Sequence, residues 1–125
     1  MKMKSRLITP QLEKEFLSYP LYSQDGRGKD AVCVCVFYVG KVRWYILEGQ
    51  TEGEDFTMYA IVVGMMETEY GYVSLNELEN VRLDARRFGL GMLEVDLMSD
   101  YKSIPLALIP DEELQQFLSF MERIS

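Results

Sequence analysis

Acid–base chemistry in this sequence would have to rest on carboxylates, lysine or tyrosine. The chain has 125 residues and no histidine, so serine–histidine and cysteine–histidine catalytic arrangements are excluded. The candidate acids are Glu67, Glu69, Glu94 and Asp96. A hydrolase of this kind needs two carboxylates within about 10 Å of each other across one cleft. Glu69 and Asp96 are the pair that this hypothesis names, and solvated surface acids are the alternative.

Aromatic residues could instead form a binding surface. Trp44, Tyr45, Tyr59, Tyr70 and Tyr72 all lie in segments with strand patterns. Tyrosine and tryptophan combine apolar area with one polar group, which is typical of interfaces and shallow ligand sites. Tyr70 and Tyr72 are two residues apart and therefore share one strand face, with Glu69 at its edge. We expect a contact surface on the Trp44, Tyr70 and Tyr72 side of the sheet; the alternative is that these rings fill the core.

An acidic turn offers oxygen ligands for magnesium. Its acids are Glu48, Glu52, Glu54 and Asp55. Their spacing matches no EF-hand loop, and a polar glycine-bearing turn needs no ion to form. We therefore expect neither a metal ion nor a cofactor.

The two cysteines, Cys33 and Cys35, lie in an apolar run with a strand pattern. Residues two apart on a strand point to the same face side by side, which does not suit a disulfide. Two thiols without histidine also cannot complete a typical zinc site. We expect two reduced core residues.

Charge and hydropathy limit the partners. The net charge is −7, from 20 acidic and 13 basic residues, which is the wrong sign for direct binding to a phosphate backbone. An acidic mimic of DNA that blocks a DNA-binding protein remains an alternative, and it requires acids in rows on one surface. No stretch approaches the roughly 20 apolar residues of a membrane span, and polar residues interrupt any signal peptide. These features predict a cytoplasmic protein.

The patterns predict one α+β domain over residues 1–125. Its antiparallel sheet is a meander of about four or five strands, packed with N-terminal, middle and C-terminal helices. The clearest element is a hairpin around Gly40-Lys41, because glycine at the first position of a two-residue loop favours a type II′ turn. This turn pairs Phe37 with Trp44 and Cys35 with Ile46. Both hairpin faces are largely apolar, so one should pack on helices and the other needs a second layer or a partner.

Helix signals mark three further places in the chain. Thr9-Pro10 starts a short helix, and Ser74 with Glu77 forms a capping box. A loop rich in arginine and glycine follows the capping-box helix. Pro110 to Glu113 opens an amphipathic last helix, whose apolar stripe should dock on the sheet.

Three ordered segments resemble a known family. They are Arg43-Trp-Tyr-Ile-Leu-Glu48, Tyr59-Ala-Ile-Val-Val-Gly64 and Glu69-Tyr-Gly-Tyr-Val-Ser-Leu-Asn-Glu-Leu-Glu79. They are similar to a family of small bacterial proteins classed as a domain of unknown function, over about Leu7 to Leu106. Members are often carried on plasmids, conjugative transposons and other mobile elements. They tend to have tryptophan where this chain has Arg43, and an arginine inside the triplet that reads Glu94-Val95-Asp96 here.

The resemblance implies a genomic context and no mechanism. Our first hypothesis is a non-enzymatic protein-binding or accessory module of a mobile element. Its binding residues would be Trp44, Glu69, Tyr70, Tyr72 and Asp96. A protein partner of unknown identity is expected, and the sequence is also compatible with a homodimer. The carboxylate-dependent hydrolase and the DNA mimic are the alternatives.

Overall fold

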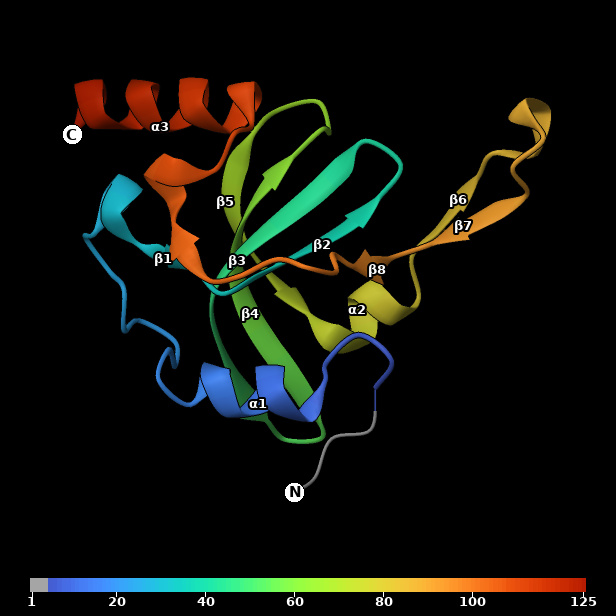
Figure 1. Ribbon diagram of the computed structural model, residues 1–125, viewed down its shortest axis with the longest axis horizontal. Helices are drawn as coiled ribbons and strands as arrows, with labels where there is room; N and C mark the ends of the chain where they lie inside the picture. Colours follow the sequence, from blue (N-terminus) through green and yellow to red (C-terminus); the bar gives the residue numbers. More distant parts are fainter. Residues whose placement is uncertain (1–4) are drawn as a thin grey trace.

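A computed structural model describes residues 5–125, and a single antiparallel sheet forms its centre (Figure 1). Five strands are hydrogen-bonded in the order β5-β4-β3-β2-β8. They are β2 (Cys35–Val39), β3 (Val42–Glu52), β4 (Asp55–Val63), β5 (Glu69–Ser74) and β8 (Asp96–Leu97). The first four form the predicted meander, and β8 joins the β2 edge from much later in the chain.

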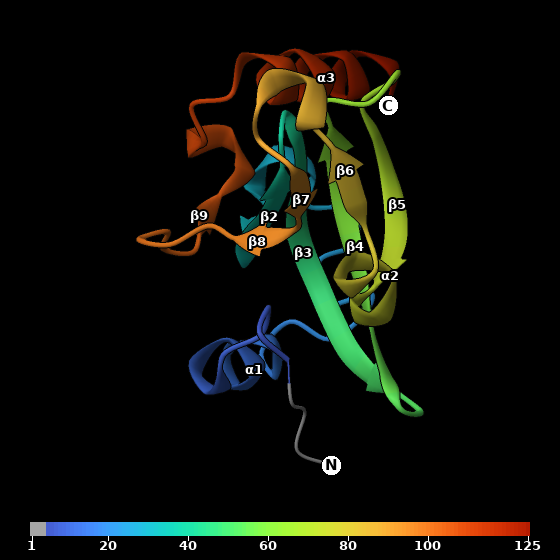
Figure 2. The same cartoon turned by 90° about the vertical axis from the view of Figure 1, so that its right-hand side faces the viewer.

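Helices and two pairs of short strands surround this sheet (Figure 2). The helices are α1 (Pro10–Phe16), α2 (Leu75–Glu79), α3 (Glu112–Ile124) and the 3₁₀ turns η1 (Gly28–Asp30), η2 (Arg86–Phe88) and η3 (Leu106–Leu108). The short pairs are β1 (Val32–Cys33) with β9 (Ile104–Pro105), and β6 (Arg82–Asp84) with β7 (Met92–Glu94). The α+β fold with N-terminal, middle and C-terminal helices is thus confirmed.

The elements that the sequence predicts correctly are those set by a turn glycine or a helix-capping residue. Gly40 has a φ of +57°, and the β2–β3 register pairs Phe37 with Trp44 and Cys35 with Ile46 as predicted. Thr9 caps α1 by accepting a hydrogen bond from the Leu12 N–H at 3.1 Å. In α2, the Ser74 and Glu77 side chains each accept from the other residue's N–H at 3.1 Å, which completes the capping box.

The sheet is buried on both faces by the chain itself. One face, which we call the α1 face, packs on α1 and α2; its sheet residues include Phe37, Trp44, Ile46, Met58 and Ala60. The other, the α3 face, packs on η3 and α3; its sheet residues include Val36, Tyr45, Leu47, Ile61 and Val63. The second layer that the apolar hairpin required is therefore supplied by the C-terminal segment, with Leu114 and Leu118 of α3 buried against the sheet.

Two expectations about local structure are wrong. Cys33 and Cys35 do not share a face, because the strand is interrupted at Val34: Cys33 packs in the α3-face core and Cys35 in the α1-face core. The arginine- and glycine-rich segment after α2 is a hairpin, β6–β7, that extends away from the sheet (Figure 1). None of the helices formed by residues 5–125 is long and apolar enough to cross a membrane.

Candidate functional site

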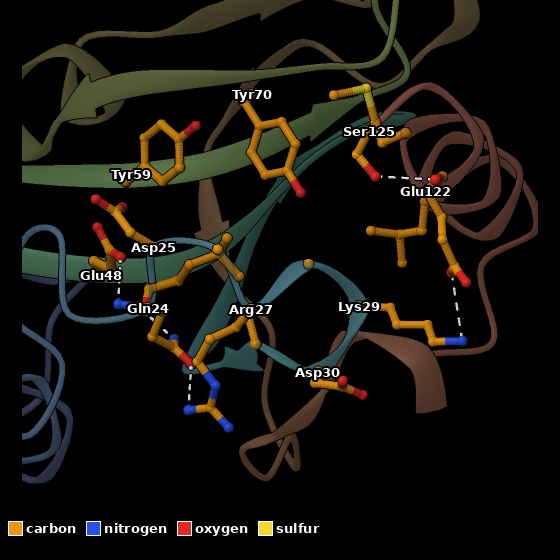
Figure 3. Close-up of a pocket in the computed structure, with 16 residues that line it drawn as sticks. Gln24, Asp25, Arg27, Lys29, Asp30, Glu48, Tyr59, Tyr70, Glu122 and Ser125 are labelled. Atoms are coloured by element: carbon orange, nitrogen blue, oxygen red, sulfur yellow. Dashed lines mark hydrogen bonds and ion pairs between the residues drawn. The ribbon is translucent and has the colours of Figure 1, made fainter.

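A cavity of about 470 Å³ opens on the α3 face. Its walls are the loop that leads into β1, strands β3 to β5, and the C-terminal half of α3 (Figure 3). This volume lies within the range of roughly 300–1,000 Å³ that is typical of small-ligand pockets. Its polar lining includes Gln24, Asp25, Arg27, Lys29, Asp30, Glu48, Tyr59, Tyr70, Glu122 and Ser125.

Glu48 borders this cavity because β3 contains a bulge. The register with β4 shifts between Ile46 and Glu48, so Glu48 lies opposite Tyr59 and Leu47 is left out of the pairing. A bulge places two successive side chains on one side of a strand. Regular alternation would put Glu48 on the α1 face with Ile46, whereas the bulge places it on the α3 face with Leu47.

The loop before β1 holds the Glu48 carboxylate. The side chain is 2% exposed, and its two oxygens accept hydrogen bonds from the backbone N–H groups of Tyr22 and Gln24, each at 2.8 Å. Gln24 is buried as well: its amide nitrogen donates to the carbonyls of Val32 and Leu47, each at 2.7 Å. The carbonyl that the bulge frees is thereby satisfied, and the loop is fixed against the sheet.

Three tyrosines form a cluster at the β4–β5 side of the site. Tyr59 and Tyr70 are stacked with ring centroids 5.6 Å apart, and Tyr59 and Tyr72 are tilted at 4.8 Å. The Tyr70 ring also packs against the Phe117 ring of α3, with ring centroids 5.3 Å apart. Burial raises the pKa of the Tyr59 phenol, and the neighbouring Tyr70, Glu48 and Asp25 raise it further. We call Tyr59, Tyr70 and Tyr72 the tyrosine cluster.

The expected contact surface is only partly present. Tyr70 and Tyr72 share the α3 face, as predicted, and Tyr72 is 55% exposed. Trp44 lies on the opposite face, because it pairs with Val62 whereas Tyr70 pairs with Ile61, the next residue of β4. It is 5% exposed in the α1-face core, so the expectation that it shares a surface with the two tyrosines is wrong.

The two candidate catalytic acids lie on opposite edges of the sheet. Glu69 is in β5 and Asp96 in β8, with β4, β3 and β2 between them. Four spacings of about 4.8 Å separate these edge strands by about 19 Å. Asp96 also forms an ion pair with Arg6 at 3.5 Å. The condition set for a paired-carboxylate hydrolase, two acids within one cleft, is not met by these residues.

The acidic turn does not gather its acids. Asp55 accepts hydrogen bonds from the N–H groups of Phe56 at 2.7 Å and Asn76 at 3.1 Å, while Glu48 faces the loop before β1. In the part of the chain that the structure describes, no three Asp, Glu or Cys side chains are placed to hold a metal ion.

We expect both cysteine thiols to be unreactive in the native protein. Burial raises the pKa of Cys33 to about 12 and that of Cys35 well above its usual range, so almost no thiolate exists at pH 8. Incubation with iodoacetamide at pH 8, followed by mass spectrometry, should show no adduct while a urea-unfolded control is fully labelled. Rapid alkylation of the native protein would contradict this burial.

Sequence reasoning missed most of the cavity. The sequence pointed to Tyr59 and Tyr70 as aromatic candidates, but it suggested Glu48 only as a metal ligand and assigned Gln24 no role of its own. The available signal was an acid directly after the apolar run Trp44-Tyr-Ile-Leu47, since a buried carboxylate requires dedicated hydrogen-bond donors. The loop that supplies them precedes Glu48 by more than twenty residues, so its role could not be read from local spacing.

Comparison with known proteins gives a family and no activity. Neither the curated proteins nor the solved structures include a significant match to this chain. A family model described as a protein of unknown function (DUF2958) matches residues 7–105, a segment that contains Glu48 and the tyrosine cluster but not α3. Because the match covers most of the sequence, the chain belongs to the DUF2958 family of proteins of unknown function.

Proposed function

We propose that this protein is a non-enzymatic binding module that holds a protein partner at the cavity beside the tyrosine cluster. The observation that carries the proposal is the cavity itself, a volume of about 470 Å³ with Tyr59 and Tyr70 along one wall. Tyr72 continues the aromatic surface into solvent. Exposed tyrosine next to a concave site is typical of residues that contribute strongly to protein interfaces.

The chemistry of the remaining residues supports binding over catalysis. The sequence has no histidine, and both thiols are buried with raised pKa values. Glu69 and Asp96 occupy opposite sheet edges. A hydrolase built on those two acids therefore has less support than a binding module.

An acidic mimic of DNA also has less support, because arginines interrupt the acidic surface. Arg6 lies within 3.5 Å of both Glu94 and Asp96, and Arg86 lies 2.8 Å from Asp84. Rows of free acids are what a mimic of a phosphate backbone would present. The accessory role in a mobile element rests on the resemblance of the sequence segments alone.

We expect Tyr72→Ala to abolish partner capture without unfolding the protein. Tyr72 is 55% exposed, so its truncation should lower the free energy of unfolding by less than about 1 kcal/mol. Loss of a central interface tyrosine costs about 2 kcal/mol of binding, or about 30-fold in affinity. The measurement is affinity capture by the tagged protein from a bacterial lysate, with quantitative mass spectrometry of the retained proteins.

Tyr38→Ala is the matched control for this experiment. Tyr38 is also an exposed tyrosine, but it lies on β2 beside Asp96, near the opposite edge of the sheet. A stoichiometric partner retained by Tyr38→Ala and lost by Tyr72→Ala supports the proposal. A partner that both variants retain equally would place the binding surface elsewhere.

A further inference from the structure

The cavity beside the tyrosine cluster carries an excess of negative charge. Four acidic side chains and two basic ones line it, which leaves a net charge of −2. Lys29 and Glu122 form an ion pair across its rim, with Lys29 Nζ 3.4 Å from Glu122 Oε2. Arg27 donates to the side-chain oxygen of Gln24 at 3.4 Å, and Figure 3 shows its guanidinium turned away from Asp25 and Glu48.

Two acids of the cavity, Asp25 and Glu48, have no cationic partner among the residues that the structure describes. The carboxylates of Asp25 and Glu48 both lie near enough to the Tyr59 phenol to raise its pKa, and both line the cavity (Figure 3). Within residues 5–125, neither forms an ion pair with a lysine or arginine. Backbone hydrogen bonds hold the buried Glu48 carboxylate, but its negative charge has no nearby positive charge to balance it in the described chain. The cavity therefore carries unbalanced negative charge that a positively charged ligand would neutralise.

Glu48 still has acceptor capacity for such a group. A carboxylate offers about four lone-pair positions, and each Glu48 oxygen accepts one backbone N–H. The loop thus fixes the carboxylate without saturating it. Because the donors are backbone groups, the charge is held in place before any ligand arrives.

The aromatic and apolar walls of the cavity suit a long side chain that ends in a cation. The parts of the Tyr59 and Tyr70 rings that line the cavity can attract a cation through their π electrons. Ala31, Leu47 and Leu118 also line the cavity and offer apolar contact to an alkyl stem. An anionic ligand would meet the same net negative charge, so the glycine-bearing loop at Gly26 and Gly28 does not favour a phosphate.

We infer that this cavity binds an alkylammonium or guanidinium group, presented as a lysine or arginine side chain by the protein partner. The inference rests on the proposed binding function and adds the chemistry that the site recognises. The cation would lie between the Asp25 and Glu48 carboxylates and the rings of Tyr59 and Tyr70. A free polyamine carries the same chemistry and is separated from a partner side chain by the test.

To test this, the full-length chain is titrated with small probes. Binding is monitored through the NMR chemical shifts of the Asp25, Glu48 and Tyr59 backbone amides. The probes are Nα-acetyl-arginine methylamide, its lysine counterpart, spermidine, and Nα-acetyl-citrulline methylamide as a neutral isostere of the arginine probe. We expect the arginine or lysine probe to saturate with a dissociation constant of about 1 mM, and citrulline to bind at least tenfold more weakly. Equal binding of arginine and citrulline, or no shift with any cation at about 10 mM, would overturn the inference.

Single-charge variants connect the binding to this site. Asp25→Asn removes an exposed charge that forms no ion pair in the described chain, and should weaken binding of the arginine probe about tenfold. Glu52→Gln removes the same charge from the exposed end of β3 and should leave the affinity unchanged. Asp25→Asn is the variant of choice because Glu48→Gln would also disturb the two backbone hydrogen bonds. Equal effects of Asp25→Asn and Glu52→Gln would show a general charge effect and overturn the site assignment.

The outcomes separate this inference from the proposed function. If no cationic probe binds but Tyr72→Ala still loses the partner, the module binds its partner by other chemistry and only this inference fails. If spermidine binds at least a hundredfold more tightly than the arginine and lysine probes, the site serves a free polyamine and the side-chain assignment fails. If the arginine or lysine probe binds and competes with the captured partner, both are supported.

Discussion

Replacing Trp44 by alanine is expected to lower the free energy of unfolding by about 3–5 kcal/mol. The side chain is 5% exposed and lies in the α1-face core with Phe37 and Met58. Truncation removes the largest side chain of the sequence and leaves a cavity that a close-packed core fills only in part. Urea unfolding followed by circular dichroism measures the loss, since Trp44 is the only tryptophan and its fluorescence is removed with it.

Trp44→Phe is the matched control, and it should recover a substantial part of this loss because it keeps an aromatic ring in the core. A Trp44→Ala variant within about 1 kcal/mol of the parent protein would contradict the buried placement. Domains of this size are stable by only about 5–15 kcal/mol, so the expected loss is a large fraction of the total. Loss of partner capture by a Trp44 variant would therefore report unfolding, whereas Tyr72→Ala tests the surface itself.

The second large loss of stability is expected when Asp111, which connects the start of α3 to the sheet, is replaced by alanine. Its carboxylate accepts from the Leu114 N–H at 3.2 Å as the N-cap of α3. It also accepts from Arg43 at 3.0 Å and 2.7 Å, and from the Tyr45 hydroxyl. Asp111→Ala removes the cap and leaves the half-buried Arg43 without its closest carboxylate. We expect a loss of about 3–4 kcal/mol, from about 1 kcal/mol for the cap and the remainder for the broken charge pair.

Asp111→Asn separates these two contributions. Asparagine caps helices about as well as aspartate, so this variant should be more stable than Asp111→Ala by about 1 kcal/mol. Urea unfolding gives the stability, and hydrogen exchange of the Leu114 to Leu118 amides reports whether α3 itself opens. Protection of α3 unchanged in both variants would show that Asp111 does not hold the helix.

The same carboxylate makes α3 sensitive to acid. Burial alone would raise the pKa of Asp111, but hydrogen bonds from Tyr45, Arg43 and the Leu114 N–H outweigh it and lower this pKa below 3.8. A carboxyl whose pKa is lower in the folded state stabilises the protein above its unfolded pKa and loses that contribution as the pH falls through the folded pKa. The Asp111 contribution should therefore be complete above about pH 5 and be lost as the pH falls through its folded pKa, which lies below 3.8, and Asp111→Asn should lack this component of the acid response.

The elements that the sequence determined are those whose causes lie within a few residues. Gly40 at the first turn position fixes the β2–β3 register, because a two-residue loop of this type permits one pairing. The Ser74–Glu77 capping box is a pair of hydrogen bonds across three residues. The apolar stripe of α3, with Leu114 and Leu118 buried, follows from the helical period alone.

Only the tertiary structure decided which side chains meet. Both sheet faces are apolar, so no composition argument could tell that Trp44 faces α1 while Tyr70 faces α3. The bulge that turns Glu48 into the cavity depends on Gln24 and the loop before β1, whose hydrogen bonds form only after folding brings them to Leu47. A one-residue shift in strand pairing moves every later side chain to the other face. Contacts between distant segments set that shift, and with it the position of the candidate site.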